Sequence, residues 1–157
     1  MHDQIPSRHL INKPTIFLID EDDDSRPSFR LNLKKKGYHV SIAIDEEDAL
    51  DRVKKGCFDA DLVLMNFVRK SSEQILEIGR NICRAGKLSA PVLVIAHKYG
   101  EDLEGKDIKV SENEYITYLE DGDQLHNLLC RLIPTASENR IVLKSLNNSQ
   151  NNLECVS

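Results

Sequence analysis

The feature that most constrains the fold is an alternation of short apolar runs with stretches of helical periodicity. Most of the runs are rich in Val, Ile and Leu and have few polar positions, which is typical of parallel strands buried on both faces. The five predicted strands are residues 15–19, 38–44, 62–65, 91–96 and 115–119. Strands separated by helices predict a doubly wound α/β fold with a five-stranded parallel sheet and right-handed crossovers.

Helical periodicity between the strands is clear except in one place. Apolar side chains recur at helical spacing before Lys36, in residues 45–56, in residues 72–84 and in residues 125–133. Residues 100–114 differ, because Gly105 interrupts them and only Leu103, Ile108 and Val110 are available for packing. We therefore predict a short or irregular fourth helix there.

The chain length fits one domain with short extensions. Residues 14–133 carry all the predicted elements, and residues 1–13 form a polar, flexible lead. Residues 134–157 are rich in Asn and Ser, which predicts a largely disordered tail, although residues 141–146 are apolar enough to pair with another segment.

Composition excludes several classes of function. A formal net charge of −5 disfavours nucleic acid as a partner, because phosphate binding needs a surplus of Lys and Arg. No apolar run approaches the roughly 20 residues of a membrane helix, and the N-terminus lacks the apolar block of a signal peptide, so we expect a cytoplasmic protein without a membrane partner. The four cysteines and five histidines show no zinc, redox or catalytic spacing, so we expect no enzymatic activity.

In a doubly wound sheet, functional sites form at the carboxyl ends of the strands. The residues at or just beyond the ends of the predicted strands are Asp20, Glu21, Asn66, Ala96, His97 and Tyr118. Five consecutive acids at residues 20–24 would repel a phosphate, which disfavours nucleotide and flavin binding. A carboxylate cluster suits a hard cation such as Mg²⁺, and it equally suits a solvated loop that caps a helix.

The order of these motifs resembles the receiver domain of two-component response regulators. The resemblance covers residues 14–133 and rests on IFLIDEDDDSR, KKKGYHV, EEDALDRVKKGCFDADLVLMN, APVLVIA and YITYL. It implies a flavodoxin-like fold in which an Asp after the third strand accepts a phosphoryl group. It also implies an acidic pair that binds Mg²⁺, and a Ser or Thr and a Lys that contact the phosphoryl group.

The resemblance transfers only the acidic pair, as Asp20 and Glu21. The phosphoacceptor position holds Asn66, the hydroxyl position Ala96 and the lysine position Tyr118, while Tyr115 matches the switch aromatic. A neutral amide lacks a nucleophilic carboxylate oxygen, Ala cannot donate a hydrogen bond and neutral Tyr cannot replace an ammonium group. The pattern indicates a degenerate receiver, or pseudo-receiver.

We therefore expect a stand-alone pseudo-receiver that signals through protein contacts without phosphorylation at the usual position. Its partner would be a protein such as a signalling kinase or regulator, and Mg²⁺ binding would be weak at most. The predicted contact surface is the first helix, or the region from the fourth strand to the last helix. Its exposed positions include Lys34, Lys35, Lys36, His126 and Arg131.

Two alternatives remain open. One is a phosphoaccepting regulator that uses a non-standard acid, either Asp61 or Asp22, although Asp61 lies at the opposite end of the third strand. The other is a thiol or small-molecule sensor that uses Cys57 or Cys83. The oligomeric state does not follow from the sequence.

Overall fold

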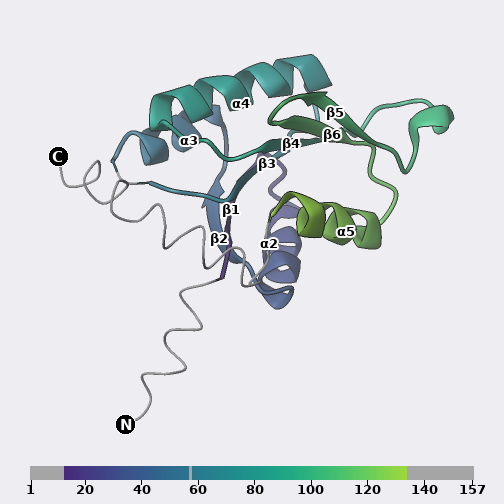
Figure 1. The fold of residues 1–157 in the computed structure, drawn as a ribbon, viewed down its shortest axis with the longest axis horizontal. Coiled ribbons are helices and arrows are strands. Elements are labelled where there is room, and N and C mark those ends of the chain that lie inside the picture. Colours follow the sequence, from purple (N-terminus) through teal and green to yellow (C-terminus); the bar gives the residue numbers. More distant parts are fainter. Residues whose placement is uncertain (1–12, 57, 134–157) are drawn as a thin grey trace, which may run out of the picture.

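The computed structural model describes residues 13–56 and 58–133, which form a six-stranded sheet with helices on both faces (Figure 1). The strand order is β2-β1-β3-β4-β6-β5, and every neighbouring pair is parallel except β5 and β6. The strands are β1 (Thr15–Asp20), β2 (His39–Ala43), β3 (Leu62–Asn66), β4 (Val92–Ile95), β5 (Asp107–Ser111) and β6 (Glu114–Thr117). The predicted doubly wound α/β fold is confirmed.

Within the described residues, four α-helices cover the sheet, two on each face (Figure 1). Helices α3 (Glu46–Val53) and α4 (Ser72–Gly86) pack on one face, and α2 (Arg26–Lys35) and α5 (Gly122–Leu132) pack on the other. Successive side chains of β1 and β3 alternate between the two apolar clusters, so Phe17 belongs to one and Leu18 to the other. Apart from Thr15, every residue of these two strands is buried, because helices cover both of their faces.

The region between β4 and β6 differs in part from the prediction of a short or irregular fourth helix and a five-stranded sheet. It contains one turn of 3₁₀ helix, η1 (Glu101–Leu103), followed by β5, which pairs antiparallel with β6. The physical reason is the period-two alternation of Ile108 and Val110 with polar neighbours, which suits an edge strand better than a helix. Gly105 lies between η1 and β5 with φ +82°, a conformation that favours glycine.

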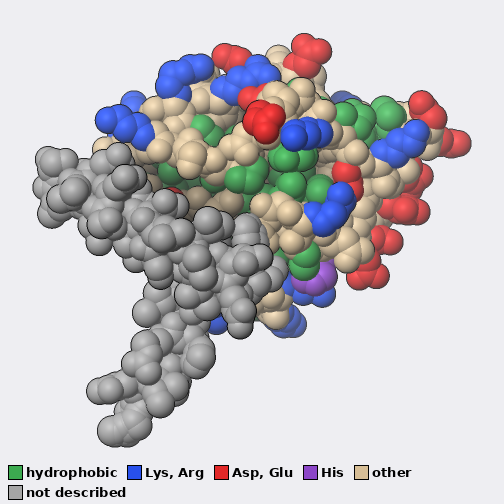
Figure 2. Space-filling model, viewed as in Figure 1, with side chains coloured by type: hydrophobic (Ala, Val, Ile, Leu, Met, Phe, Trp, Pro, Cys, Tyr) green, Lys and Arg blue, Asp and Glu red, His purple; other side chains and the backbone are tan. Residues whose placement is uncertain are grey.

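Acidic side chains gather over η1 and the start of α5, at the right-hand rim of the face in Figure 2. Among the described residues, no helix is long and apolar enough to cross a membrane. The predicted extensions, residues 1–13 and 134–157, lie outside the described part of the chain apart from Lys13.

Candidate functional site

The carboxyl ends of β1, β3 and β4 bring the predicted site residues to one edge of the sheet. Asp20 ends β1 and lies in register with Asn66, which ends β3. The backbone N–H of Glu21 donates to the carbonyl oxygen of Asn66 at 3.2 Å, so the two strands remain paired to their last residues. Ala96 follows β4, and its N–H donates to the carbonyl oxygen of Thr117 at 3.0 Å. Sequence reasoning anticipated this grouping because parallel strands end on the same edge.

Asp20 is a buried carboxylate with incomplete hydrogen bonding. Its Oδ1 accepts from the backbone N–H of Asp22 at 2.8 Å, while its buried Oδ2 has no hydrogen-bond partner at standard geometry among the described residues. Burial raises the pKa of Asp20, and this effect is opposed by the Asp22 N–H, the neighbouring Asn66 side chain and the charge of Arg26. Burial therefore makes ionisation of Asp20 less favourable than that of a solvent-exposed carboxyl group.

Asn66 is only 3% exposed, and its amide oxygen is already occupied. The Nε2–H of His97 donates to Asn66 Oδ1 at 2.5 Å, which places an imidazole from the loop after β4 over the phosphoacceptor position. The sequence placed His97 near this edge but gave no indication of this hydrogen bond. With its oxygen bound and no charge to act as a nucleophile, Asn66 has no means of forming an acyl phosphate.

Glu21 makes an ion pair that sequence reasoning did not identify. Lys70, in the loop between β3 and α4, approaches Glu21 Oε2 to 3.4 Å, and its ammonium group lies 5.3 Å from the centre of the Phe67 ring. Both partners of this pair are partly solvent-exposed. This ion pair occupies one carboxylate oxygen of Glu21, the second of the two acids that the resemblance implies would bind Mg²⁺.

The residues present fit a Mg²⁺ ion poorly. Mg²⁺ requires several oxygen ligands in near-octahedral geometry. The unpartnered Oδ2 of Asp20 suits a cation, but Glu21 faces Lys70 and the side-chain oxygen of Asn66 faces His97. No group of three or more His, Cys, Asp or Glu side chains in the described residues has an arrangement that would hold a metal ion.

The two tyrosines predicted at switch positions are held by packing on opposite faces of the sheet. Tyr118 packs edge-to-face against Tyr99, with ring centres 5.4 Å apart, and the Tyr99 hydroxyl donates to the carbonyl oxygen of Leu119 at 2.8 Å. Tyr115 packs against the apolar cluster beneath α2 and α5. Both are half-buried, with part of each ring packed against apolar neighbours.

A cavity of about 330 Å³ lies beside the site and has a positively charged lining. It is bordered by Ala96 and by the cationic or titratable side chains Arg69, Lys70, His97 and Lys98. No carboxylate or thiol is among the described residues that line it. The cavity therefore offers no group of the kind that accepts a phosphoryl group in a receiver domain.

The alternative acids lie in structural positions. Asp61 Oδ2 accepts from the backbone N–H of Thr15 at 2.7 Å, at the end of β3 opposite Asn66. Asp22 accepts from the Ser25 hydroxyl and the Asp24 N–H, and these bonds, the first above all, lower the pKa of its carboxyl group. These bonds give both carboxylates structural roles within loops.

The thiol alternative rests on one described residue. Cys83 is half-buried in α4, and burial above all, with a smaller effect of Glu114, raises the pKa of its thiol to about 11. Such a thiol is almost entirely protonated at neutral pH, so it is a poor nucleophile. Cys57 lies outside the described residues.

No protein-family model matches the sequence, and no curated protein sequence matches it either. Solved structures do match. A response regulator from Thermotoga maritima has a TM-score of 0.58 and 22% identity, covering 78% of this chain and 99% of its own. The chemotaxis protein CheY4 of Vibrio cholerae has a TM-score of 0.55 and 20% identity, covering 77% of this chain and 99% of its own.

A third match comes from the crystal structure of histidine kinase ThkA in complex with response regulator protein TrrA. It has a TM-score of 0.56 and 18% identity, covering 76% of this chain and 97% of that one. At these identities the likeness establishes the fold. The chain therefore has the fold of response-regulator receiver domains, as the resemblance in sequence implied.

Proposed function

We propose that this protein is a pseudo-receiver, a receiver-fold module that acts in signal transduction by binding a protein partner without being phosphorylated at the usual position. The observation that supports this most directly is Asn66, a buried neutral amide whose oxygen accepts from His97. Ala96 and Tyr118 support the same conclusion, because they replace the hydroxyl and the ammonium group that the family resemblance implies.

A protein partner fits this proposal better than catalysis or a metal cofactor. Among the described residues, the site contains a buried Asp20, an ion-paired Glu21 and no nucleophile in a suitable position. The match to a structure of histidine kinase ThkA in complex with response regulator protein TrrA supports a protein partner for a chain with this fold. In this chain the candidate surface is the face formed by α2 and α5, which carries the exposed Lys34, Lys35 and Lys36.

The decisive test is intact mass spectrometry after incubation with Mg²⁺ and acetyl phosphate. The native protein should gain no phosphoryl group, because Asn66 is not a nucleophile. The matched control is the triple variant Asn66→Asp/Ala96→Thr/Tyr118→Lys, which supplies all three missing groups in the same fold. A phosphoryl gain in the triple variant alone would assign the difference to these side chains.

Stoichiometric phosphorylation of the native protein would refute the proposal. Peptide mapping would then identify the acceptor, and Asp22→Asn and Asp61→Asn variants would separate the two alternative acids. Asn66→Asp alone should remain a poor acceptor, since the hydroxyl and ammonium groups that contact the phosphoryl group are still missing.

A further inference from the structure

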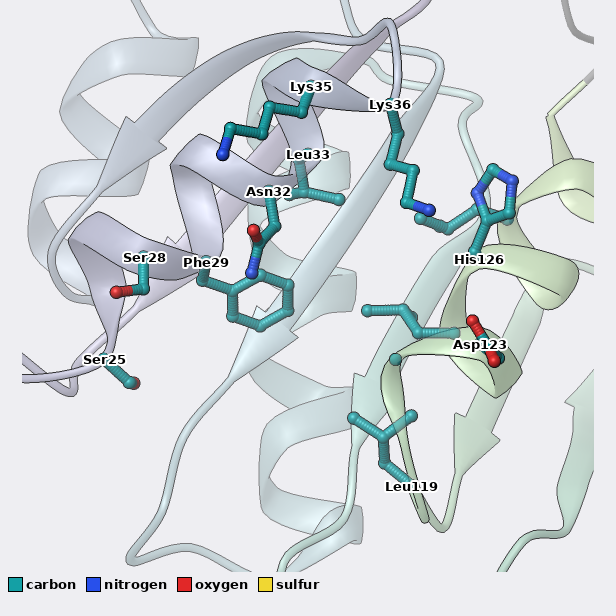
Figure 3. Close-up of a pocket in the computed structure, with 13 residues that line it drawn as sticks. Ser25, Ser28, Phe29, Asn32, Leu33, Lys35, Lys36, Leu119, Asp123 and His126 are labelled. Carbon is teal, nitrogen blue, oxygen red and sulfur yellow. The ribbon is translucent and has the colours of Figure 1, made fainter.

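An apolar groove runs between α2 and α5, on the face of the sheet opposite α3 and α4. It has a volume of about 640 Å³. Its apolar lining comes from both helices and from the loop before α5, and consists of Phe29, Leu33, Leu119, Leu125 and Leu129. Figure 3 shows the ring of Phe29 and the side chains of Leu33 and Leu119 lying along this groove. The groove is long enough and apolar enough to receive a short peptide segment.

Charged side chains are distributed unevenly along the groove. Lys35, Lys36 and His126 lie at one end, and Asp123 lies toward the other end (Figure 3). The order of lining residues along each helix shows that α2 and α5 run in the same direction, from the Asp123 end to the Lys36 end. A bound segment would therefore be oriented by charge, with its acid near the lysines and its base near Asp123.

The chain leaves α5 at the lysine end of this groove. Helix α5 ends at Leu132, and Ile133 is completely buried in the apolar cluster beneath α2 and α5. Residues 134–157 follow, outside the described part of the chain. A segment that turned back here would run along the groove antiparallel to α5.

The sequence that follows has the composition that such a segment needs. Within residues 134–157, the only cluster of large apolar side chains is Ile141, Val142, Leu143 and Leu146. Glu138 precedes this cluster, and Lys144 lies toward its far end. On an antiparallel path Glu138 would meet the lysines first and Lys144 would approach Asp123, so these two charges match the groove, while Arg140, directly before the apolar cluster, would lie toward the lysine end and oppose the match in part.

The length of the chain also permits this path. Helix α5, with 11 residues, is about 16 Å long. Residues 134–140 span up to about 23 Å when extended, which is ample for reversing direction after Ile133. Residues 141–146 cover up to about 20 Å, which matches the length of α5.

We propose that residues 141–146 pack into the groove between α2 and α5, antiparallel to α5, with Glu138 beside Lys35 and Lys36. This intramolecular contact covers part of the surface that the proposed function assigns to a protein partner, so the two would compete. The inference goes beyond the proposed function and does not depend on the state of Asn66.

The test uses the full chain and a double substitution, Ile141→Ser/Leu143→Ser, with Asn147→Ser/Asn148→Ser as the matched control. The readout is the amide NMR spectrum. The first variant should shift the amide signals of Leu125, His126 and Leu129 while those of β1 and β3 remain unchanged, because the substitutions empty the groove and leave the core intact. The control should leave all of these signals in place.

A synthetic peptide of residues 136–148 gives an independent measurement. It should bind the Ile141→Ser/Leu143→Ser variant and bind the native chain at least about tenfold more weakly, because a tethered segment has an effective concentration in the millimolar range. The orientation is tested by Lys144→Asp, which should shift the Leu125 and Leu129 amides as the double substitution does, and by Asp123→Lys in the same chain, which should restore them.

Two results would overturn the proposal. The first is that the amide signals of the groove residues do not change in the Ile141→Ser/Leu143→Ser variant. The second is that these amide signals change with protein concentration while light scattering reports a doubled mass. That result would assign the groove to a second copy of the chain.

Discussion

Asn66→Asp should destabilise the fold at neutral pH, and the register of β1 and β3 gives the size of the effect. Residue 66 lies directly opposite Asp20, and paired residues on neighbouring strands have side chains on the same face. Two carboxylates about 5 Å apart repel each other by about 3 kcal/mol at an effective dielectric constant of roughly 20. Partial compensation by the nearby His97 leaves an expected net loss of about 2 kcal/mol.

The assay is urea unfolding in EDTA, with the double-mutant cycle of Asp20→Asn and Asn66→Asp. The single variant should lose about 2 kcal/mol of unfolding free energy, which corresponds to a fall in Tm of roughly 4–8 °C for a domain of this size. The cycle should give a coupling energy of about 3 kcal/mol between the two positions, because removing either charge removes the repulsion.

The dependence on pH follows from the sign of the pKa shift. Burial already raises the pKa of Asp20 above its unfolded value, and a second carboxylate would raise it further. Below the unfolded pKa the carboxyl groups are protonated in both states and the penalty disappears. As pH rises through the folded pKa values, the carboxylates ionise and stability is lost.

Millimolar Mg²⁺ should restore part of the lost stability in the Asn66→Asp variant, because the substitution adds a third carboxylate to the site. The reasoning would be refuted if Asn66→Asp were as stable as the native protein at neutral pH. A coupling energy near zero would also refute it, since any loss would then come from a cause other than repulsion by Asp20.

Three further predictions follow from the geometry. The native protein should bind Mg²⁺ weakly, so amide shifts followed by NMR should not saturate below about 1 mM Mg²⁺. Saturation well below that concentration would contradict the poor fit of these residues to Mg²⁺. Cys130 is exposed and should react with a disulfide reagent in the folded protein. Cys83, with its pKa raised to about 11, should react only on unfolding, as peptide mass spectrometry can establish, and fast labelling of Cys83 would revive the thiol-sensor alternative. Gly79→Ala should lower stability by about 1 kcal/mol despite the better helix propensity of Ala, because the added Cβ would lie 2.9 Å from Val92 Cγ1. In a Val92→Ala background the same change should be neutral or stabilising, and an equal loss in both backgrounds would exclude this contact as the cause.

The sequence alone was sufficient to predict the parallel strands and the end of the sheet at which the candidate site forms. Buried parallel strands have uninterrupted apolar runs, and the ends of those runs locate Asp20, Asn66 and Ala96. The sequence was insufficient to predict β5, because the alternating pattern of this strand is short and follows a glycine. It was also insufficient to predict the hydrogen bond of His97 with Asn66, because a contact between the end of one strand and the loop after another depends on tertiary geometry.

Strand β5, which the sequence did not predict, is held to α5 by a polar network. Asp107 of β5 accepts from the Thr117 hydroxyl at 2.8 Å and from Gln124 Nε2 at 2.9 Å, and its other oxygen accepts from Arg131 at 2.9 Å. Charge-assisted bonds that converge on one carboxylate favour a single arrangement of the strand and the helix.

A phosphorylation switch needs both a charge change at the site and a nearby element with two arrangements of similar energy. In this chain the acceptor position is a neutral Asn66, and the element beside β6 is a strand fixed through Asp107. Under the proposed function the two departures are consistent with each other, because a module without a phosphoryl input has no use for a surface that responds to one. The simplest means of regulation is then to cover or expose a fixed surface with another segment of the chain. The groove between α2 and α5 would be that surface.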